Sequence, residues 1–328
     1  MPSIVCLGEA LIDMVSQAPG DLAHAPGFEK APGGAPANVA AGLGILGASV
    51  GFIGKVGSDP WGDCLDETLR DCNVDTARLA RSTEEFTRLA FVWYTEDGKH
   101  GFMFHGKRAA DELLSPDDLS QDYIAKCDIF HFGSITTIKD PARTATYRAV
   151  DIAAGSGSVI SYDPNWRPPL WPDEKSALDE MVRAVEMVDV VKVNEAELEF
   201  LSGQNDIAEG AKVLYDLGPE LVAVTLGPEG CYYHHSNATG SIPGHKVEVV
   251  DTVGCGDAFV AGMLLKTLEC ERDLGDLTAE DLQAICAFAN AAAAITATGK
   301  GAIPALPARE EVEELLSGKR LGEGDAGF

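Results

Sequence analysis

Short apolar segments alternate with amphipathic segments over most of the 328 residues. The strand-like segments, rich in Val and Ile, are Ser3–Gly8, Ser49–Gly54, Ile129–Gly133, Val159–Asp163, Val188–Val193 and Leu221–Leu226. The helix-like segments are Ala37–Leu46, Trp61–Cys72, Ala142–Ala154, Lys175–Glu186, Ala196–Leu201 and Ala208–Leu217. Uninterrupted apolar strands suit a sheet that is buried on both faces and connected by crossover helices. The alternation therefore predicts an α/β fold with a doubly wound, mostly parallel central sheet.

One region departs from this alternation. Thr87–Tyr94 and Gly101–Phe104 flank the pair Asp97-Gly98, which predicts a β-hairpin with a tight turn. A hairpin this rich in aromatic residues either packs on the body or covers a site as a lid. We favour the lid, because a strand at Leu11–Val15 could join the hairpin in a small sheet.

The predicted organisation is therefore a core with a small β-sheet lid. The core comprises residues 1–10, 31–84 and 111–320, and the lid comprises residues 11–30 and 85–110. The last eight residues, LGEGDAGF, are expected to form a disordered tail.

The charge of the chain excludes some classes of partner. With 52 acidic and 25 basic residues the net charge is −27, which repels nucleic acid and anionic membranes, so we expect neither as a partner. Eight cysteines form no CxxC pair and are expected to be reduced. The first residues lack a basic segment followed by an apolar one, and no apolar run reaches about 18 residues. We therefore expect a cytoplasmic protein.

The string Gly42-Leu43-Gly44-Ile45-Leu46-Gly47 matches GxGxxG but stands in the wrong place for a dinucleotide fingerprint. Such a fingerprint follows a strand and opens a helix, whereas these glycines come late in a predicted helix. Helix packing is the better interpretation. An NAD-dependent oxidoreductase stays open as an alternative, and no GxxxxGK[ST] loop is present.

Residues 251–259, DTVGCGDAF, lie between the alternating segment HKVEVV (245–250) and an apolar helical pattern. We expect a strand, a tight turn and then a helix. The turn Gly254-Cys255-Gly256 would present backbone N–H groups to an anion, above all a phosphate. Asp257 is either a helix cap or a general base for phosphoryl transfer. The thiol of Cys255, at a helix N-terminus, is expected to have a lowered pKa.

A second glycine turn precedes the first helix. Gly33 and Gly34 permit a ligand to approach the backbone, and Asn38 is a polar side chain among small apolar ones. Asp13 is likewise polar within the apolar run ALIDMV. Capping or burial would explain these residues, but their place beside glycines favours contact with a ligand.

GGAPAN and DTVGCGD together resemble the two signatures of the ribokinase-like (PfkB) family of carbohydrate kinases. The resemblance extends over nearly the whole chain through HFGSIT (131–136), SYDPNWRPPLWP (161–172), KVNEAELEFL (192–201) and VTLGPEG (224–230). Within that family the sequence looks most similar to the fructokinases. The resemblance implies a ribokinase-like fold.

The resemblance implies roles for particular residues. Asp257 matches the catalytic base, and Gly254, Cys255 and Gly256 match the anion hole. The positions that match sugar-binding residues are Asp13, Gly33, Gly34, Asn38, Phe102, Phe104 and Arg167. Those that match the nucleotide site are Lys192, Asn194, Thr225, Gly227, Gly230 and Asn290.

Two further positions are implied as cation sites. Asn194 and Glu197 match a motif that positions Mg²⁺, often through water, although an Asn followed by Glu three residues later is also a capping box. Asp251, with carbonyl groups around Thr296–Gly301, matches a site for a monovalent cation such as K⁺.

We therefore expect an ATP-dependent sugar kinase that phosphorylates a primary hydroxyl, converting fructose to fructose 6-phosphate. The alternatives are a kinase for ribose or for 2-keto-3-deoxygluconate, or a catalytically weak sugar-binding relative. The expected cofactors are ATP, Mg²⁺ and K⁺. An exposed apolar face of the lid would favour a homodimer.

Overall fold

The computed structural model describes residues 1–94, 100–106 and 108–318. The predicted turn at Asp97-Gly98 and the predicted disordered tail lie outside these residues. No helix in the described residues is long and apolar enough to span a bilayer.

The core is a nine-stranded sheet with the order β13-β12-β11-β10-β9-β8-β1-β4-β5. Its strands are β1 (Ile4–Leu7), β4 (Val50–Gly57), β5 (Val74–Ser82), β8 (Ile129–Gly133), β9 (Val159–Asp163), β10 (Val190–Asn194), β11 (Leu221–Thr225), β12 (Gly230–His235) and β13 (Ala238–Pro243). The strands from β5 to β11 in this order pair in parallel, while β12 and β13 are antiparallel. The predicted mostly parallel sheet is confirmed.

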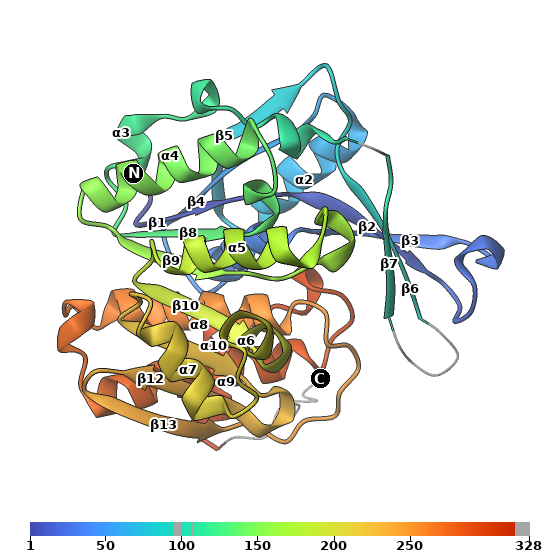
Figure 1. Ribbon diagram of the computed structural model, residues 1–328. Helices are drawn as coiled ribbons and strands as arrows, with labels where there is room; N and C mark the ends of the chain where they lie inside the picture. The colour runs from blue at the N-terminus through green and yellow to red at the C-terminus, as the bar shows by residue number, and fades with distance from the viewer. Residues whose placement is uncertain (95–99, 107, 319–328) are drawn as a thin grey trace, which may run out of the picture.

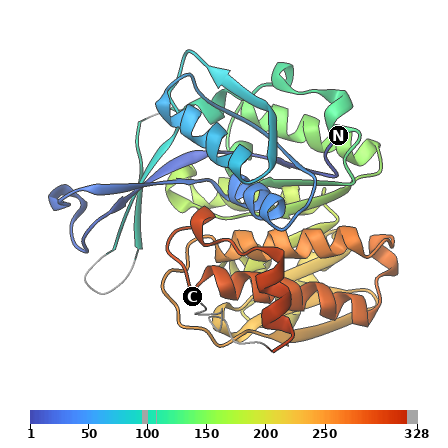
Figure 2. The ribbon, with the colours of Figure 1, turned by 180° about the vertical axis from the view of Figure 1, so that it is seen from behind.

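Helices cover both faces of this sheet (Figures 1 and 2). One apolar core contains side chains of α1 (Ala35–Ile45), α2 (Pro60–Asp71), α8 (Cys255–Glu269), α9 (Ala279–Thr296) and α10 (Arg309–Leu316). The other contains side chains of α3 (Gln121–Ile124), α4 (Ala142–Gly155), α5 (Glu174–Val185), α6 (Glu195–Ser202) and α7 (Ile207–Tyr215). Two cores on one sheet are the doubly wound architecture that the alternation predicted.

A second sheet extends from the side of the body (Figure 1). Its order is β3-β2-β6-β7, formed by β2 (Leu11–Ser16), β3 (Phe28–Gly33), β6 (Leu89–Tyr94) and β7 (His100–Phe104). The strand predicted at Leu11–Val15 does join the hairpin, by parallel pairing of β2 with β6.

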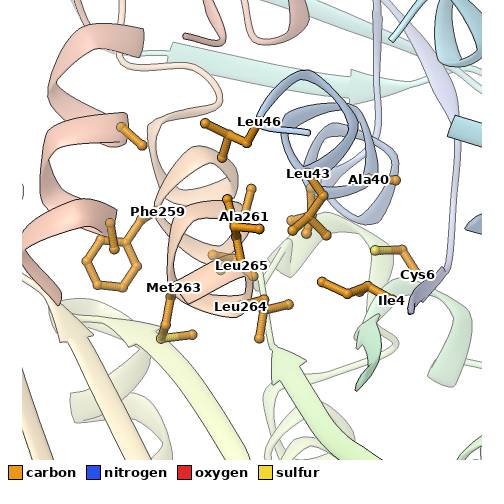
Figure 3. Packing of buried hydrophobic residues seen from close by; sticks show 14 of the residues in the cluster. Ile4, Cys6, Ala40, Leu43, Leu46, Phe259, Ala261, Met263, Leu264 and Leu265 are labelled. Carbon is orange, nitrogen blue, oxygen red and sulfur yellow. The ribbon is translucent and has the colours of Figure 1, made fainter. Parts of the chain in front are cut away.

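Gly42 and Gly44 of the GxGxxG string serve close packing of α1, and Gly47 follows the end of this helix with φ of +93°. A Cβ on Gly42 would lie 2.9 Å from Cβ of Ala261, and one on Gly44 would overlap the carbonyl oxygen of Cys72. Figure 3 shows Leu43 and Leu46 of α1 beside residues of α8, including Ala261. Small residues let these two helices approach closely, as the helix-packing interpretation requires.

The strand expected at HKVEVV does not form. Residues 244–249 have neither helix nor strand structure, and Val249 and Val250 are 57% and 62% exposed. The alternating pattern was misleading because β13 ends at Pro243, and no strand pairing of the described chain includes the residues that follow.

Candidate active site

A cavity of about 830 Å³ lies beyond the carboxyl ends of β1, β9, β10 and β11. Ligands of open α/β sheets bind at this edge. Seventeen of the predicted site residues line the cavity: Asp13, Gly34, Asn38, Phe102, Phe104, Arg167, Lys192, Asn194, Glu197, Thr225, Gly227, Gly230, Gly254, Cys255, Gly256, Asp257 and Asn290.

Gly33 and Asp251 do not line the cavity but lie beside its walls. A Cβ on Gly33 would lie 2.8 Å from Oδ2 of Asp13, so the glycine leaves room for that carboxylate. Asp251 accepts hydrogen bonds from the N–H groups of Val253 (3.1 Å) and Gly301 (2.9 Å). It therefore ties the glycine turn to the chain near residue 300.

Asp257 lies in the first turn of α8 with its side chain buried. Its Oδ2 accepts a hydrogen bond of 2.8 Å from Nδ2 of Asn38 on α1. Gly254 is the N-cap of α8, and Asp257 stands three residues later as an acidic residue of the first turn, so Asp257 is not the N-cap itself. Burial raises the pKa of Asp257 to about 7, against the lowering effects of the Asn38 bond and of Lys192.

The turn before α8 has the geometry of an anion site. Gly254 has φ of +83°, and a Cβ there would lie 2.6 Å from Cβ of Ala302. The first N–H groups of a helix have no intrahelical acceptor and can turn to a ligand, although that of Cys255 makes a long bond of 3.4 Å to the carbonyl oxygen of Thr252. A Cβ on Gly256 would lie 3.0 Å from Nζ of Lys192, which places that ammonium group against the turn.

Asp163 forms an ion pair with Lys192 and was not predicted from the sequence as a site residue. Nζ of Lys192 donates to Oδ2 of Asp163 at 3.0 Å, and both side chains are buried. Burial lowers the pKa of Lys192, but Asp163, Glu197 and Asp257 raise it above its ordinary value, so Lys192 stays protonated. The sequence signal was present, because Asp163 ends a predicted strand and precedes Arg167 by four residues.

Asp13 and Arg167 both line the cavity, and their charges interact. Burial raises the pKa of Asp13 to about 7, and the charge of Arg167 lowers it. The guanidinium carbon of Arg167 lies 5.8 Å from the ring centre of Phe102, on β7. The four-stranded sheet thus contacts a residue that follows β9 at the cavity.

Glu197 forms the capping box that the sequence suggested. Its Oε2 accepts from N–H of Asn194, whose Oδ1 accepts from N–H of Glu197, both at 2.9 Å. Its Oε1 accepts from N–H of Trp166 at 2.9 Å. In the described residues no three His, Cys, Asp or Glu side chains are grouped to hold a metal. A cation near Glu197 would therefore be held through water and ligand oxygens.

Glu9 was likewise not predicted from the sequence as a site residue. It follows β1, lines the cavity and is 2% exposed. An acidic residue at the end of the apolar run SIVCLG was a signal that could have found it.

The expected lowering of the pKa of Cys255 is wrong. Burial, together with the charges of Asp251 and Asp257, raises the pKa of this thiol to about 11. Two carboxylates close by outweigh the helix N-terminus, so the sulfur is a neutral thiol at physiological pH.

A family comparison decides the class of protein. The model of the pfkB family of carbohydrate kinases matches residues 1–309. The chain belongs to this family. The expected class of enzyme, a carbohydrate kinase, is therefore confirmed.

Curated PfkB relatives are similar over nearly the whole chain. Fructokinase-1 of Zea mays is 43% identical over 95% of this chain and 97% of its own. Fructokinase-2 of Solanum lycopersicum is 43% identical over 96% of each chain.

Solved structures agree with the fold. Fructokinase of Xylella fastidiosa with bound ATP is 32% identical, with a TM-score of 0.88 over 97% of this chain and 99% of that one. Fructokinase of Vibrio cholerae, bound to fructose, ADP and a calcium ion, is 33% identical, with a TM-score of 0.84 over 96% and 99%. A double mutant of the Vibrio cholerae enzyme was solved with fructose, ADP and a potassium ion.

Replacing Cys255 tests its place in this PfkB site. Cys255→Ala keeps the backbone N–H, so we expect turnover within about threefold of wild type, the scale of a surface substitution. Because a neutral thiol is a poor nucleophile, mild hydrogen peroxide should slow both proteins equally. Turnover measured before and after peroxide checks this. Loss of activity in wild type alone would contradict it.

Proposed function

We propose that the protein is a fructokinase, which transfers the γ-phosphoryl group of ATP to a primary hydroxyl of fructose and forms fructose 6-phosphate. One observation carries the proposal: a buried carboxylate, Asp257, adjoins a glycine turn that can bind an anion, inside a cavity large enough for sugar and nucleotide. The fructokinase relatives support the choice of sugar.

Asp257 acts as the general base. It accepts the proton of the sugar hydroxyl, whose oxygen forms a bond to the γ-phosphorus while the bond from phosphorus to the ADP oxygen breaks. A pKa of about 7 lets this carboxylate be both ionised and basic near neutral pH. Asn38 orients it through the 2.8 Å hydrogen bond.

The developing charge on the phosphoryl group meets donors from two elements. The N–H groups of Gly254, Cys255 and Gly256 lie at the start of α8, and the ammonium group of Lys192 on β10 lies against that turn. Preorganised donors of this kind lower the barrier because they need no reorientation during the reaction. Arg167 supplies a further cation near the sugar end.

The sugar and nucleotide occupy different ends of the cavity. Asp13, Gly33, Gly34, Asn38 and Arg167 bind the sugar hydroxyls, with Phe102 and Phe104 of the lid above them. Thr225, Gly227, Gly230, Lys192 and Asn194 surround the nucleotide. Asn290 stabilises the cavity wall at the nucleotide end, because its Nδ2 donates a hydrogen bond of 3.0 Å to the carbonyl oxygen of Ile242.

Two cations complete the proposal. Mg²⁺, held through water by Glu197 and by phosphate oxygens, would neutralise phosphate charge. K⁺ would bind carbonyl groups around residues 296–301, with Asp251 fixing that segment through Gly301.

We also propose that the small sheet is a lid and that the protein forms a homodimer through it. Residues 11–30 and 85–110 serve as the lid over a core formed by residues 1–10, 31–84 and 111–320. Phe102 and Met103 on the lid are 36% and 44% exposed, which favours a homodimer through this sheet. All eight cysteines are free, as expected in a reducing compartment such as the cytoplasm.

The direct test is ADP release with a panel of sugars. We expect fructose to give the highest kcat/KM, ahead of ribose and 2-keto-3-deoxygluconate, with fructose 6-phosphate as the product. Little turnover on every sugar and sugar acid would overturn the kinase proposal, and a preference for another sugar would overturn the fructose assignment.

Asp257→Asn tests the base. The amide keeps the hydrogen-bonding shape but accepts no proton, so kcat should fall about 10²–10⁴-fold while fructose binding is largely kept. Calorimetric fructose binding and ADP release measure the two effects. Asp122→Asn, on exposed surface, is the matched control. Turnover close to wild type would remove Asp257 from the mechanism.

A further inference from the structure

Glu9 is a buried carboxyl group that the proposed mechanism does not use. It lies between β1 and β2 at the wall of the cavity. Its Oε1 accepts a hydrogen bond of 3.0 Å from N–H of Ala35. Its Oε2 is buried and has no hydrogen-bond partner among the described residues. A buried polar atom without a partner costs stability and calls for an explanation.

The bond to Ala35 supplies a cap that α1 lacks. Its N-cap is Gly34, which has φ of +105° and no side chain with which to cap the helix. A Cβ on Gly34 would lie 2.5 Å from the carbonyl oxygen of Glu9, so the two segments touch. Glu9 therefore caps α1 from a distant part of the sequence.

This cap lies about one helical turn from Asn38, which contacts the proposed base. Asn38 is three residues after Ala35, and its Nδ2 donates to Asp257 at 2.8 Å. The start of α1 therefore sets where Asn38 meets Asp257. A displacement of this start would weaken a contact on which the chemistry depends.

The surroundings of Glu9 favour its neutral form. Burial above all, and then the charge of Asp111, raise the pKa of Glu9 to about 8, against the lowering effects of the backbone N–H groups of Glu9 and Ala35 and of the charge of Arg88. Arg88 is already engaged, because it donates to Asp111 at 2.9 Å and to Glu112 at 2.9 Å. Near neutral pH Glu9 is thus mainly a carboxylic acid, whose Oε1 accepts the hydrogen bond from Ala35.

We propose that Glu9 is a positioning residue for phosphoryl transfer, which acts as a neutral acid that caps α1 and aligns Asn38 with Asp257. The inference rests on the proposed function and adds a residue to it. Ionised Glu9 would be a buried charge repelled by that of Asp111, and the turn would have to move to relieve this repulsion.

Stability tests the neutral form without any activity. The pKa of Glu9 is about 8 in the folded chain and about 4.3 in an unfolded one, so folding loses stability as pH rises from about 4.3 to 8. Glu9→Gln keeps the acceptor and never ionises. Its Tm should exceed that of wild type by a margin that opens above pH 5 and grows until about pH 8. Equal Tm values across this range would overturn the neutral form.

The pH dependence of kcat/KM for fructose tests the positioning. Wild type should gain activity as Asp257 ionises near pH 7 and lose it above about pH 8 as Glu9 ionises. Glu9→Gln should keep the rise and lack the fall. Glu9→Leu, which cannot accept from Ala35, should lose about 10–100-fold in kcat, and its rise should move to higher pH because the Asn38 bond lowers the pKa of Asp257.

Several other titratable groups lie near Asp257. The groups that face it are Asn38, Asp163, Arg167, Lys192 and the thiol of Cys255. Lys192 has a raised pKa and that of Cys255 is about 11, so neither accounts for a fall near pH 8. Asp13 also titrates near pH 7, but no bond joins it to Asn38 in the described chain, so its share of the rise should not move.

The controls separate this inference from the proposed function. Glu310→Gln, an exposed change on α10, should match wild type in Tm and in pH profile. A fall above pH 8 that persists in Glu9→Gln, or an unshifted rise in Glu9→Leu, would overturn the positioning role. If Glu9→Leu does not fold, the Glu9→Gln profile decides. If wild type phosphorylates no sugar, the proposed function and the positioning role both fall, and the Tm comparison still decides the protonation state of Glu9.

Discussion

The site depends on the hydrogen bond between Asn38 and Asp257, which joins residues 219 positions apart in the sequence. It exists because α1 and α8 pack closely on the same face of the sheet, with Gly42 against Ala261. Both helices begin at the carboxyl edge of the sheet, each after a glycine with positive φ. The close packing of small residues therefore brings the turn at Gly33-Gly34 and the turn at Gly254-Cys255-Gly256 to one cavity.

Burial gives this cavity its chemistry. Asp13, Asp257 and Glu9 all have raised pKa values because water is largely excluded from them. Such carboxyl groups suit a neutral polyol, which offers hydroxyl groups as both donors and acceptors. Lys192 and Arg167 supply positive charge locally, so a chain with a net charge of −27 can still accept an anionic nucleotide.

Much of this arrangement could be predicted from the sequence, since strand and helix periods and glycine turns are local signals. The parallel sheet, α1, α8 and the two glycine turns follow from them, whereas most of the other cavity residues were predicted through the resemblance to the PfkB family. Features that depend on distant neighbours could not be predicted. The alternation in HKVEVV predicted a strand that does not pair with another. Strand β5 and the antiparallel strands β12 and β13 were not predicted. Gly33 and Asp251 lie beside the cavity walls and do not line the cavity. Asp163 and Glu9 matter only through Lys192 and Ala35, which the fold brings to them.

The most direct test of the central claim is a crystal structure of the protein with fructose and a non-hydrolysable ATP analogue. The account predicts a primary hydroxyl oxygen of fructose within about 3 Å of the Asp257 carboxylate, a reach suited to proton transfer. It also predicts the terminal phosphate on the N–H groups of Gly254, Cys255 and Gly256. A sugar whose primary hydroxyls all point away from Asp257, or a phosphate bound elsewhere, would contradict it.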